Sequence, residues 1–283
     1  MQTRREFLGT LGIASVGAAV LACARTNGQA KTPATAMPLG IQLYTLRSLL
    51  ERDFDGTLAR IAEIGYREVE FAGYYKRTPA QVREVLRRTG LSSPSAHIPL
   101  PASDDVWTRA LDDARAVGHA WAVIPWLDPS LRRTPDDWSR FADRLNHLAP
   151  LAKSAGLRLA YHNHDFELAS NGAGTYLDLL LARTDPALVD FEMDVYWVTK
   201  AGGDPLALLA KYPGRFPLLH LKDATAAPER RMVNVGSGAI DFSALLKAAR
   251  GQKLAHAFVE HDEPADPLAF ARASYAHIAT LSF

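Results

Sequence analysis

Two histidines, an asparagine, an aspartate and a glutamate stand directly behind an apolar run in the segment LRLAYHNHDFEL, residues 157–168. A turn that only had to reverse the chain would more simply use Gly, Pro or Asn-Gly. Imidazoles and carboxylates are the side chains that ligate divalent metal ions and that transfer protons in enzymes. The segment therefore predicts metal binding or acid–base chemistry at the end of a strand.

Polar side chains also follow other apolar runs of the sequence. They are Glu70, His97, Asp194, His220, Lys222, Asp223, Glu260, His261 and Asp262. One imidazole and two carboxylates from Asp194, His220 and Glu260 would suit Mn, Co, Fe or Zn better than Mg. Any one such residue could equally be a hydrogen-bonded polar group at a strand end. Together, an inward Asp, His and Glu are costly to bury unless a cation or dense hydrogen bonding offsets their desolvation.

Short apolar runs rich in β-forming residues alternate with segments of helical period. The expected strands are 39–44, 67–71, 93–98, 120–126, 157–163, 188–194, 217–222 and 257–261. The expected helices are 53–65, 78–90, 134–156, 175–184, 204–212, 241–251 and 266–281. This alternation with eight strands predicts an α/β fold, a single-domain (β/α)8 TIM barrel. An open doubly wound sheet is the alternative, but no Gly-x-Gly-x-x-Gly follows the first strand.

A barrel would gather the polar residues at one place, because active sites of this fold lie at the carboxyl ends of the strands. Residues 37–283 have a suitable length, since such barrels have about 250 residues. They carry 28 basic and 30 acidic side chains. This near-neutral charge gives no reason to expect nucleic acid as a partner.

Residues 1–36 have the composition of an export signal followed by a flexible tether. Arg4 and Arg5 precede an uncharged stretch, residues 7–22, that is too short and too weakly apolar for a good membrane span. The paired arginines resemble a twin-arginine signal. Cys23, the one cysteine of the chain, follows Val-Leu-Ala as in a lipoprotein processing box, and simple cleavage nearby is the alternative. We expect a periplasmic protein or a lipoprotein anchored through Cys23, with no internal disulfide.

Six motifs resemble, in order along the chain, those of the sugar phosphate isomerase/epimerase superfamily, whose members have xylose-isomerase-like TIM barrels. They are GIQLYTLR, YHNHDFE, EMDVYWVTKAGGDP, GRFPLLHLKD, VGSGAIDF and VEHDEP. The resemblance implies one divalent metal ion held by Glu, Asp, His and Glu on strands five to eight. Two of these carboxylates exchange the substrate proton in the keto-sugar epimerases. Asp194, His220 and Glu260 match the Asp, the His and the last Glu.

Two positions depart from the family pattern. The strand-five Glu aligns with Ala160, and the family's substrate-binding His aligns with Trp197. We expect the fourth metal ligand to be His162 or Glu167, and His162 has the strand parity of the missing Glu. An imidazole in place of the carboxylate also removes one of the two epimerase bases.

Metal-assisted proton abstraction next to a carbonyl is the expected chemistry, with Glu260, His164 and Lys222 as candidate catalytic groups. Isomerisation or epimerisation follows by reprotonation. Elimination follows instead if a leaving group sits β to the carbanion, as in relatives that cleave 3-keto-glycosides. A non-catalytic periplasmic sugar-binding protein and a nuclease are alternatives from other classes, and the near-neutral charge argues against the nuclease.

Export favours an unphosphorylated sugar or keto-glycoside, because phosphorylated sugars are largely cytoplasmic. The candidate substrate-binding residues are His97, Asn163, Trp197, Tyr196, Glu70 and Trp126. The loop at residues 234–242, NVGSGAIDF, could bind phosphate through its amides, but a turn that uses Gly236 and Gly238 for positive φ is favoured. The sequence leaves open whether the protein is a homo-oligomer.

Overall fold

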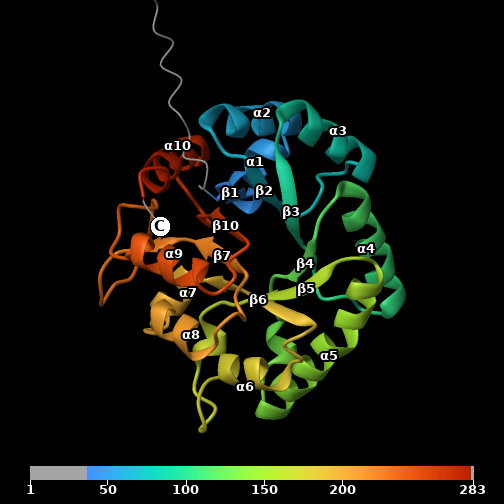
Figure 1. Cartoon of the computed structure of the whole chain (residues 1–283), viewed down its shortest axis with the longest axis vertical. Helices are drawn as coiled ribbons and strands as arrows, with labels where there is room; N and C mark the ends of the chain where they lie inside the picture. The colour runs from blue at the N-terminus through green and yellow to red at the C-terminus, as the bar shows by residue number, and fades with distance from the viewer. Residues whose placement is uncertain (1–36, 282–283) are drawn as a thin grey trace, which may run out of the picture. The chain divides into compact units, whose positions relative to one another are not determined.

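Eight parallel strands close into a barrel in the order β1-β10-β7-β6-β5-β4-β3-β2 (Figure 1). The computed structural model describes residues 37–281. The strands are β1 (Gly40–Gln42), β2 (Glu68–Phe71), β3 (Ser92–His97), β4 (Trp121–Ile124), β5 (Arg158–His162), β6 (Val189–Asp194), β7 (Leu218–Leu221) and β10 (His256–Val259). The predicted (β/α)8 TIM barrel is therefore confirmed, and the predicted strand ends shift by at most two residues.

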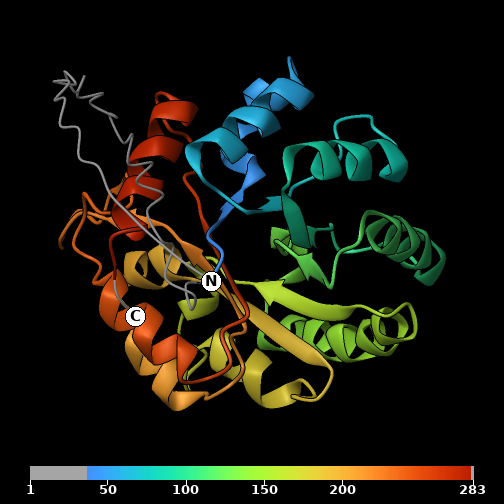
Figure 2. The same ribbon diagram turned by 45° about the horizontal axis from the view of Figure 1, so that its top comes forward.

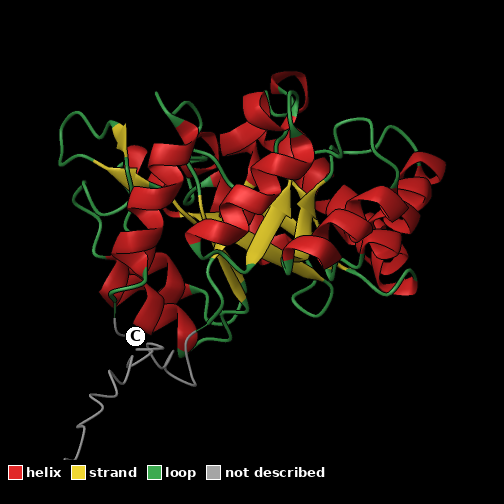
Figure 3. Cartoon of the chain, turned by 90° about the horizontal axis from the view of Figure 1, so that it is seen from above, coloured by secondary structure: helices red, strands yellow, loops and turns green. Residues whose placement is uncertain are grey.

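Helices surround the barrel and follow one another round it in chain order (Figure 1). They are α1 (Arg47–Leu50), α2 (Phe54–Ile64), α3 (Pro79–Thr89), α4 (Asp104–Val117), α5 (Pro135–Ser154), α6 (Tyr176–Arg183), α7 (Val195–Lys200), α8 (Pro205–Lys211), α9 (Phe242–Arg250) and α10 (Pro267–Ile278). The tilted view and the view from above show the strands in the middle with helices outside them (Figures 2 and 3). A two-stranded antiparallel sheet, β8 (Asp223–Ala224) and β9 (Met232–Val233), lies outside the barrel order.

The start of α3 illustrates how the sequence sets these helix boundaries. The Thr78 hydroxyl accepts a hydrogen bond from the Gln81 amide at 3.3 Å, and the Gln81 side chain accepts one from the Thr78 amide at 2.9 Å. Such a cap stabilises a helix by about 1 kcal/mol. The helix ends at Gly90, whose φ of 70° is the left-handed conformation that favours glycine.

Three helices, α1, α4 and α7, have no counterpart in the sequence prediction, and the longest of them is α4. Its buried residues are Trp107, Leu111, Ala114 and Val117. Their spacing of three and four residues is the helical pattern, and Ser103 caps the first turn by accepting from the Val106 amide at 3.4 Å. The signal was therefore present, but it is sparse because only these four of its 14 residues are buried.

Inside the barrel, an apolar layer of side chains lies directly below the polar residues at the carboxyl ends of the strands. Val123, Ala160, Leu218 and Phe258 form a buried cluster there, with Trp121 packed against it. A Cβ at position 40 would lie 2.3 Å from the Phe258 ring, so Gly40 leaves the room that this ring fills. Ala160, Leu218 and Phe258 each stand two residues before a predicted site residue, so the polar groups form the next layer toward the carboxyl ends.

A buried histidine beside β3 makes stability depend on pH. The His119 ring donates from Nδ1 to the Ser93 carbonyl at 2.8 Å and accepts at Nε2 from the Tyr74 hydroxyl at 3.0 Å. Burial lowers the pKa of His119 to about 4, against 6.5 for an ordinary histidine. The unfolded chain therefore binds more protons between these values, so stability is complete above pH 6.5 and falls as the pH drops toward 4.

We expect this histidine to account for about 3 kcal/mol of stability lost between pH 7 and pH 4. His119→Gln should flatten the pH dependence of the free energy of unfolding in this window. Urea unfolding at several pH values measures it. If the free energy of unfolding falls equally steeply with decreasing pH in the variant and in the unaltered protein, His119 is not the cause of the pH dependence.

The predicted export signal, the tether and Cys23 lie outside the described residues. Among residues 37–281, the helices are all too short or too polar to cross a membrane.

Candidate metal centre and active site

Four side chains at the carboxyl ends of the strands each bring a potential ligand atom within 4.8 Å of the others, and we call them the mouth group. They are His162 of β5, Asp194 of β6, His220 of β7 and Glu260 directly after β10. His162 Nε2 lies 3.3 Å from Asp194 Oδ2, and His220 Nδ1 lies 2.6 Å from Glu260 Oε2. All four are buried. The three ligands predicted from the sequence thus lie together with His162, one of the two candidates for the fourth.

Glu167, the other candidate, has a different place. Its carboxylate accepts hydrogen bonds from the Tyr161 hydroxyl and, at 2.8 Å, from the His164 amide. Tyr161 belongs to the core between barrel and helices, so Glu167 ties the short helix η3 (Phe166–Leu168) to the outer side of β5. Burial raises the pKa of Glu167 to about 7. The structure therefore leaves His162 as the candidate fourth ligand.

Asp194 is held in place by residues that the sequence assigned to substrate binding. The Asn163 side chain accepts a hydrogen bond from the Asp194 amide at 3.1 Å, and Asp194 Oδ1 accepts one from the Trp197 amide at 3.1 Å. Asn163 is only 1% exposed. The Tyr196 and Trp197 rings pack against each other, and the Trp197 indole lies 5.4 Å from the His164 ring. Asn163 and Trp197 thus hold Asp194 in place, and Tyr196 packs against Trp197.

The Lys222 ammonium contacts the carboxylates of the mouth group, Asp194 and Glu260. Its Nζ lies 3.0 Å from Asp194 Oδ2, 3.1 Å from Glu260 Oε2 and 2.7 Å from Asp262 Oδ1. Burial alone would lower the pKa of Lys222, but the three carboxylates hold it well above its usual value. Lys222 is 2% exposed, so a full positive charge is buried beside the mouth group.

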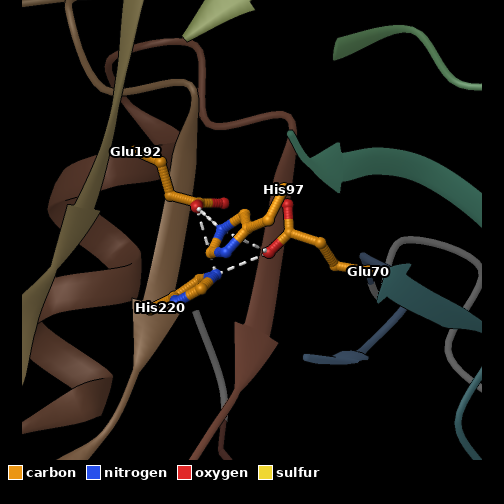
Figure 4. Close-up of side chains that lie close together, drawn as sticks. All are labelled: Glu70, His97, Glu192 and His220. Atoms are coloured by element: carbon orange, nitrogen blue, oxygen red, sulfur yellow. Dashed lines mark hydrogen bonds and ion pairs between the residues drawn. The ribbon is translucent and has the colours of Figure 1, made fainter. Parts of the chain in front are cut away.

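A second group lies inside the barrel beside the first, and we call it the deep group. It consists of Glu70, His97, Glu192 and His220, whose ligand atoms also lie within 4.8 Å of one another (Figure 4). His97 Nε2 is 2.8 Å from Glu192 Oε2, and His220 Nε2 is 2.6 Å from Glu70 Oε2. Each imidazole also lies near the other carboxylate: His97 Nε2 is 3.3 Å from Glu70 Oε2, and His220 Nε2 is 3.2 Å from Glu192 Oε2. His220 thus uses one ring nitrogen for each group.

Glu192 was not predicted as a site residue, whereas Glu70 and His97 were predicted to contact the substrate. Glu192 and Asp194 are two residues apart on one strand and therefore face the same side, and this spacing could have predicted that Glu192 points into the barrel. Burial and the neighbouring Glu192 raise the pKa of Glu70. Burial would also raise the pKa of Glu192, but the imidazoles of His220 and His97 bring it below its usual value.

His162 and Glu260 of the mouth group border a cavity of about 600 Å³. Its polar lining includes His97, His162, His164, Lys222, Glu260 and Asp262. Two aromatic rings stand at its wall, Trp126 with 44% and Tyr44 with 42% of its surface exposed. Trp126 was predicted to bind substrate. Tyr44, the last residue of the predicted strand 39–44, was not selected, and the structure places it in the short helix η1 (Leu43–Leu46). Exposed aromatic rings at a polar cavity suit the apolar faces of sugar rings.

The residues present fit a divalent cation. His220 Nδ1 and Glu260 Oε2 lie 2.6 Å apart, but this contact lacks the geometry of a hydrogen bond. Two such atoms can direct their lone pairs at a common third atom. Five carboxylates lie in the mouth group, in the deep group or next to them: Glu70, Glu192, Asp194, Glu260 and Asp262. Among the described residues, their ion pairs are with one lysine, Lys222, and otherwise only with histidine rings. Protonated imidazoles or a bound cation would supply the positive charge that these buried carboxylates need.

The glycine loop at residues 234–242 is closed by a carboxylate of the chain itself. Asp223 Oδ2 accepts hydrogen bonds from the amides of Gly236 and Gly238, both at 2.9 Å. Gly236 has a φ of 90°, and a Cβ on Gly238 would lie 2.2 Å from Asp223 Oδ1. The favoured interpretation as a glycine turn agrees with this geometry at Gly236, and Asp223 takes the amides that a phosphate would need. The predicted positive φ at Gly238 is wrong, because this glycine instead allows the close approach of Asp223.

The fold and the site define the class of protein, and comparison with known proteins agrees. Residues 58–278 match the family described as xylose isomerase-like TIM barrel, and the chain belongs to this family. The resemblance to the sugar phosphate isomerase/epimerase superfamily is thereby confirmed.

Particular relatives are similar over part or most of the chain. A solved sugar phosphate isomerase/epimerase from Parabacteroides distasonis is 28% identical with a TM-score of 0.74, and the match covers 87% of this chain and 95% of that one. An inosose dehydratase of Bacillus anthracis is 26% identical over 197 residues, 61% of this chain and 64% of the relative. An inosose dehydratase of Geobacillus kaustophilus is 27% identical over 194 residues, 60% and 61% respectively. The chain thus spans less than two thirds of the length of these two dehydratases.

Proposed function

We propose that this protein is an enzyme that removes a proton from the carbon next to the carbonyl of an unphosphorylated sugar or keto-glycoside. The observation that carries the proposal is the cavity wall, where the buried carboxylate Glu260 stands beside imidazoles and the buried ammonium of Lys222. A sugar-sized cavity with a carboxylate base and converging positive charge suits the formation of an enediolate.

Each residue has a role in this proposal. A divalent cation bound in the mouth group would polarise the carbonyl and hydroxyl oxygens of the sugar. Glu260, oriented through Oε2 by His220 and Lys222, removes the proton, and the Lys222 ammonium stabilises developing negative charge. Burial lowers the pKa of His164 to about 2, so its ring stays neutral and hydrogen-bonds a sugar hydroxyl instead of carrying the proton. This revises its predicted catalytic role.

The single carboxylate base favours some outcomes over others. Ala160 fills the position of the second carboxylate and is buried in the apolar layer, so Glu260 both takes the proton and returns it on one face. Return to the neighbouring carbon gives isomerisation. Inversion of the same carbon would need a base on the opposite face.

Elimination is the second candidate, and the same observation favours it. Glu260 takes the proton, the electron pair of the C–H bond forms a C=C bond, and the β C–O bond breaks. Glu260 then gives its proton to the departing oxygen, which leaves as water or an alcohol. Relatives at 26 and 27% identity are named as dehydratases, which supports this candidate.

A neutral substrate suits the cavity better than a sugar phosphate. Glu260, Asp262 and Glu263 border the cavity and would repel a phosphate dianion. The glycine loop, which could have offered amides to a phosphate, already binds Asp223.

Proton NMR in D₂O tests the proposal. The Mn²⁺-loaded protein is incubated with free ketoses and with 3-keto-glucosides, and the C–H next to the carbonyl should exchange for deuterium. Isomerisation adds new sugar signals, whereas elimination releases the aglycone. If sugars bind in a calorimeter but no C–H exchanges with Mn²⁺, Co²⁺ or Zn²⁺, the protein is a sugar-binding barrel and the proposal is wrong.

We also propose that the protein is exported through Arg4 and Arg5 and anchored through Cys23. The support is the paired arginines before an uncharged stretch and the cysteine behind Val-Leu-Ala. Replacing both arginines by lysine should leave the protein in the cytoplasm, and Cys23→Ser should move it from the membrane fraction to the soluble periplasmic fraction. A soluble periplasmic protein with Cys23 intact would contradict the lipid anchor.

A further inference from the structure

Two buried carboxylates in the barrel interior have no lysine or arginine to balance them among the ion pairs of residues 37–281. Glu70 and Glu192 are both fully buried, and their ion pairs are all with His97 and His220. Glu70 Oε2 also accepts a hydrogen bond from the Gln42 side-chain amide at 2.7 Å. Each glutamate also has a second oxygen, Oε1, that is buried without a hydrogen-bond partner. By contrast, the mouth group already has the ammonium of Lys222 against two of its carboxylates. The positive charge that balances the deep group must therefore come from its two imidazoles or from a cation that they bind.

The deep group also has the geometry of a ligand set. Figure 4 shows Glu70 and Glu192 pointing toward each other with the two imidazoles between them. Nitrogen and oxygen atoms alternate round the group, with separations of 2.6, 3.2, 2.8 and 3.3 Å. Ligands bonded to one cation at about 2.1 Å lie roughly 3.0–3.4 Å apart, so small movements would complete the site. Four strands, β2, β3, β6 and β7, fix these side chains.

We propose that Glu70, His97, Glu192 and His220 form a second divalent-cation position, alternative to the mouth group. Two imidazoles with two carboxylates suit Mn²⁺, Fe²⁺, Co²⁺ or Zn²⁺. The ion enters past His97, which borders the cavity and keeps a side chain that is 10% exposed. The proposal does not rest on the proposed reaction.

His220 makes the two positions exclude each other. A neutral imidazole has one free lone pair, and its other nitrogen carries a proton. With the ion in the deep group, Nε2 is the ligand and Nδ1–H faces Glu260 Oε2 at 2.6 Å. With the ion in the mouth group, Nδ1 is the ligand and Nε2–H donates to Glu70 Oε2 at 2.6 Å. Both tautomers thus find a carboxylate at hydrogen-bonding distance, and the protein holds about one ion in either of two places.

Crystals soaked in Mn²⁺ test this through anomalous scattering at the manganese edge, with calorimetry for stoichiometry. Asp194→Asn weakens the mouth group alone, so the variant should still bind about one ion per chain, placed between His97 Nε2 and His220 Nε2. Adding Glu192→Gln to it should abolish binding. Adding Glu68→Gln instead, at a buried glutamate of the same barrel paired with His256, should not.

The proposal is overturned if Asp194→Asn folds, judged by its circular dichroism and melting temperature, but binds no Mn²⁺. It is also overturned if the ion in that variant lies away from His97. Should Asp194→Asn fail to fold, Glu260→Gln removes the other mouth carboxylate and gives the same comparison.

Discussion

Glu260→Gln should slow deuterium exchange next to the substrate carbonyl about a thousand-fold, since general base catalysis typically contributes 10²–10⁴. Glutamine keeps the size of the side chain but cannot take a proton. It also loses the negative charge that pairs with His220 and Lys222 at 2.6 and 3.1 Å. The rate at saturating substrate, measured by NMR with the ion-loaded protein, gives the result.

Glu263→Gln is the matched control for this prediction. Glu263 borders the same cavity three residues further along the chain, yet it is exposed and lies outside both groups. We expect its exchange rate to stay close to that of the unaltered protein. A Glu260→Gln variant that exchanges as fast as Glu263→Gln would show that another group removes the proton.

Lys222→Met should destabilise the metal-free protein by about 3–5 kcal/mol, because removing one partner leaves buried charges of one sign. Asp194 and Glu260 would then lack the ammonium that contacts both. Mn²⁺ should restore more stability to this variant than to the unaltered protein, since the ion no longer meets a resident positive charge. Urea unfolding with and without Mn²⁺ measures both effects.

Lys211→Met provides the comparison, because Lys211 also pairs with a carboxylate, Asp178, at 2.8 Å but is 56% exposed. Such surface ion pairs contribute about 0–1 kcal/mol. Equal losses of stability in the two variants would mean that the Lys222 ammonium does not balance the mouth group. A weaker response of Lys222→Met to Mn²⁺ would mean that lysine and the ion do not compete.

The barrel was predictable because each strand and most helices have local signals. Apolar runs of strand length alternate with helical segments, and α4, the longest helix that was missed, buries only four residues. The predicted ligands Asp194, His220 and Glu260 came from the family pattern together with strand parity. The alternation of side chains along a strand also identified His162, because it faces the same side as Ala160, which occupies the position of the family's glutamate.

This alternation could not predict where side chains beyond the strand ends would point. The chain leaves β5 after His162, so Asn163 turns to the β6 backbone and Glu167 turns under Tyr161. Nor could it predict the deep group, because Glu70 and Glu192 come from strands on different sides of the barrel. Their meeting depends on barrel closure and on the lengths of the side chains that cross the interior.

Metal analysis of the purified protein tests the central claim most directly. The protein is stripped with a chelator, reconstituted with Mn²⁺, Co²⁺ or Zn²⁺, freed of unbound ion and measured by elemental analysis. We expect about one ion per chain, retained in Glu167→Gln and lost in His220→Ala, because His220 belongs to both groups. No bound ion in the unaltered protein with any of the three metals, or equal retention in His220→Ala, would contradict it.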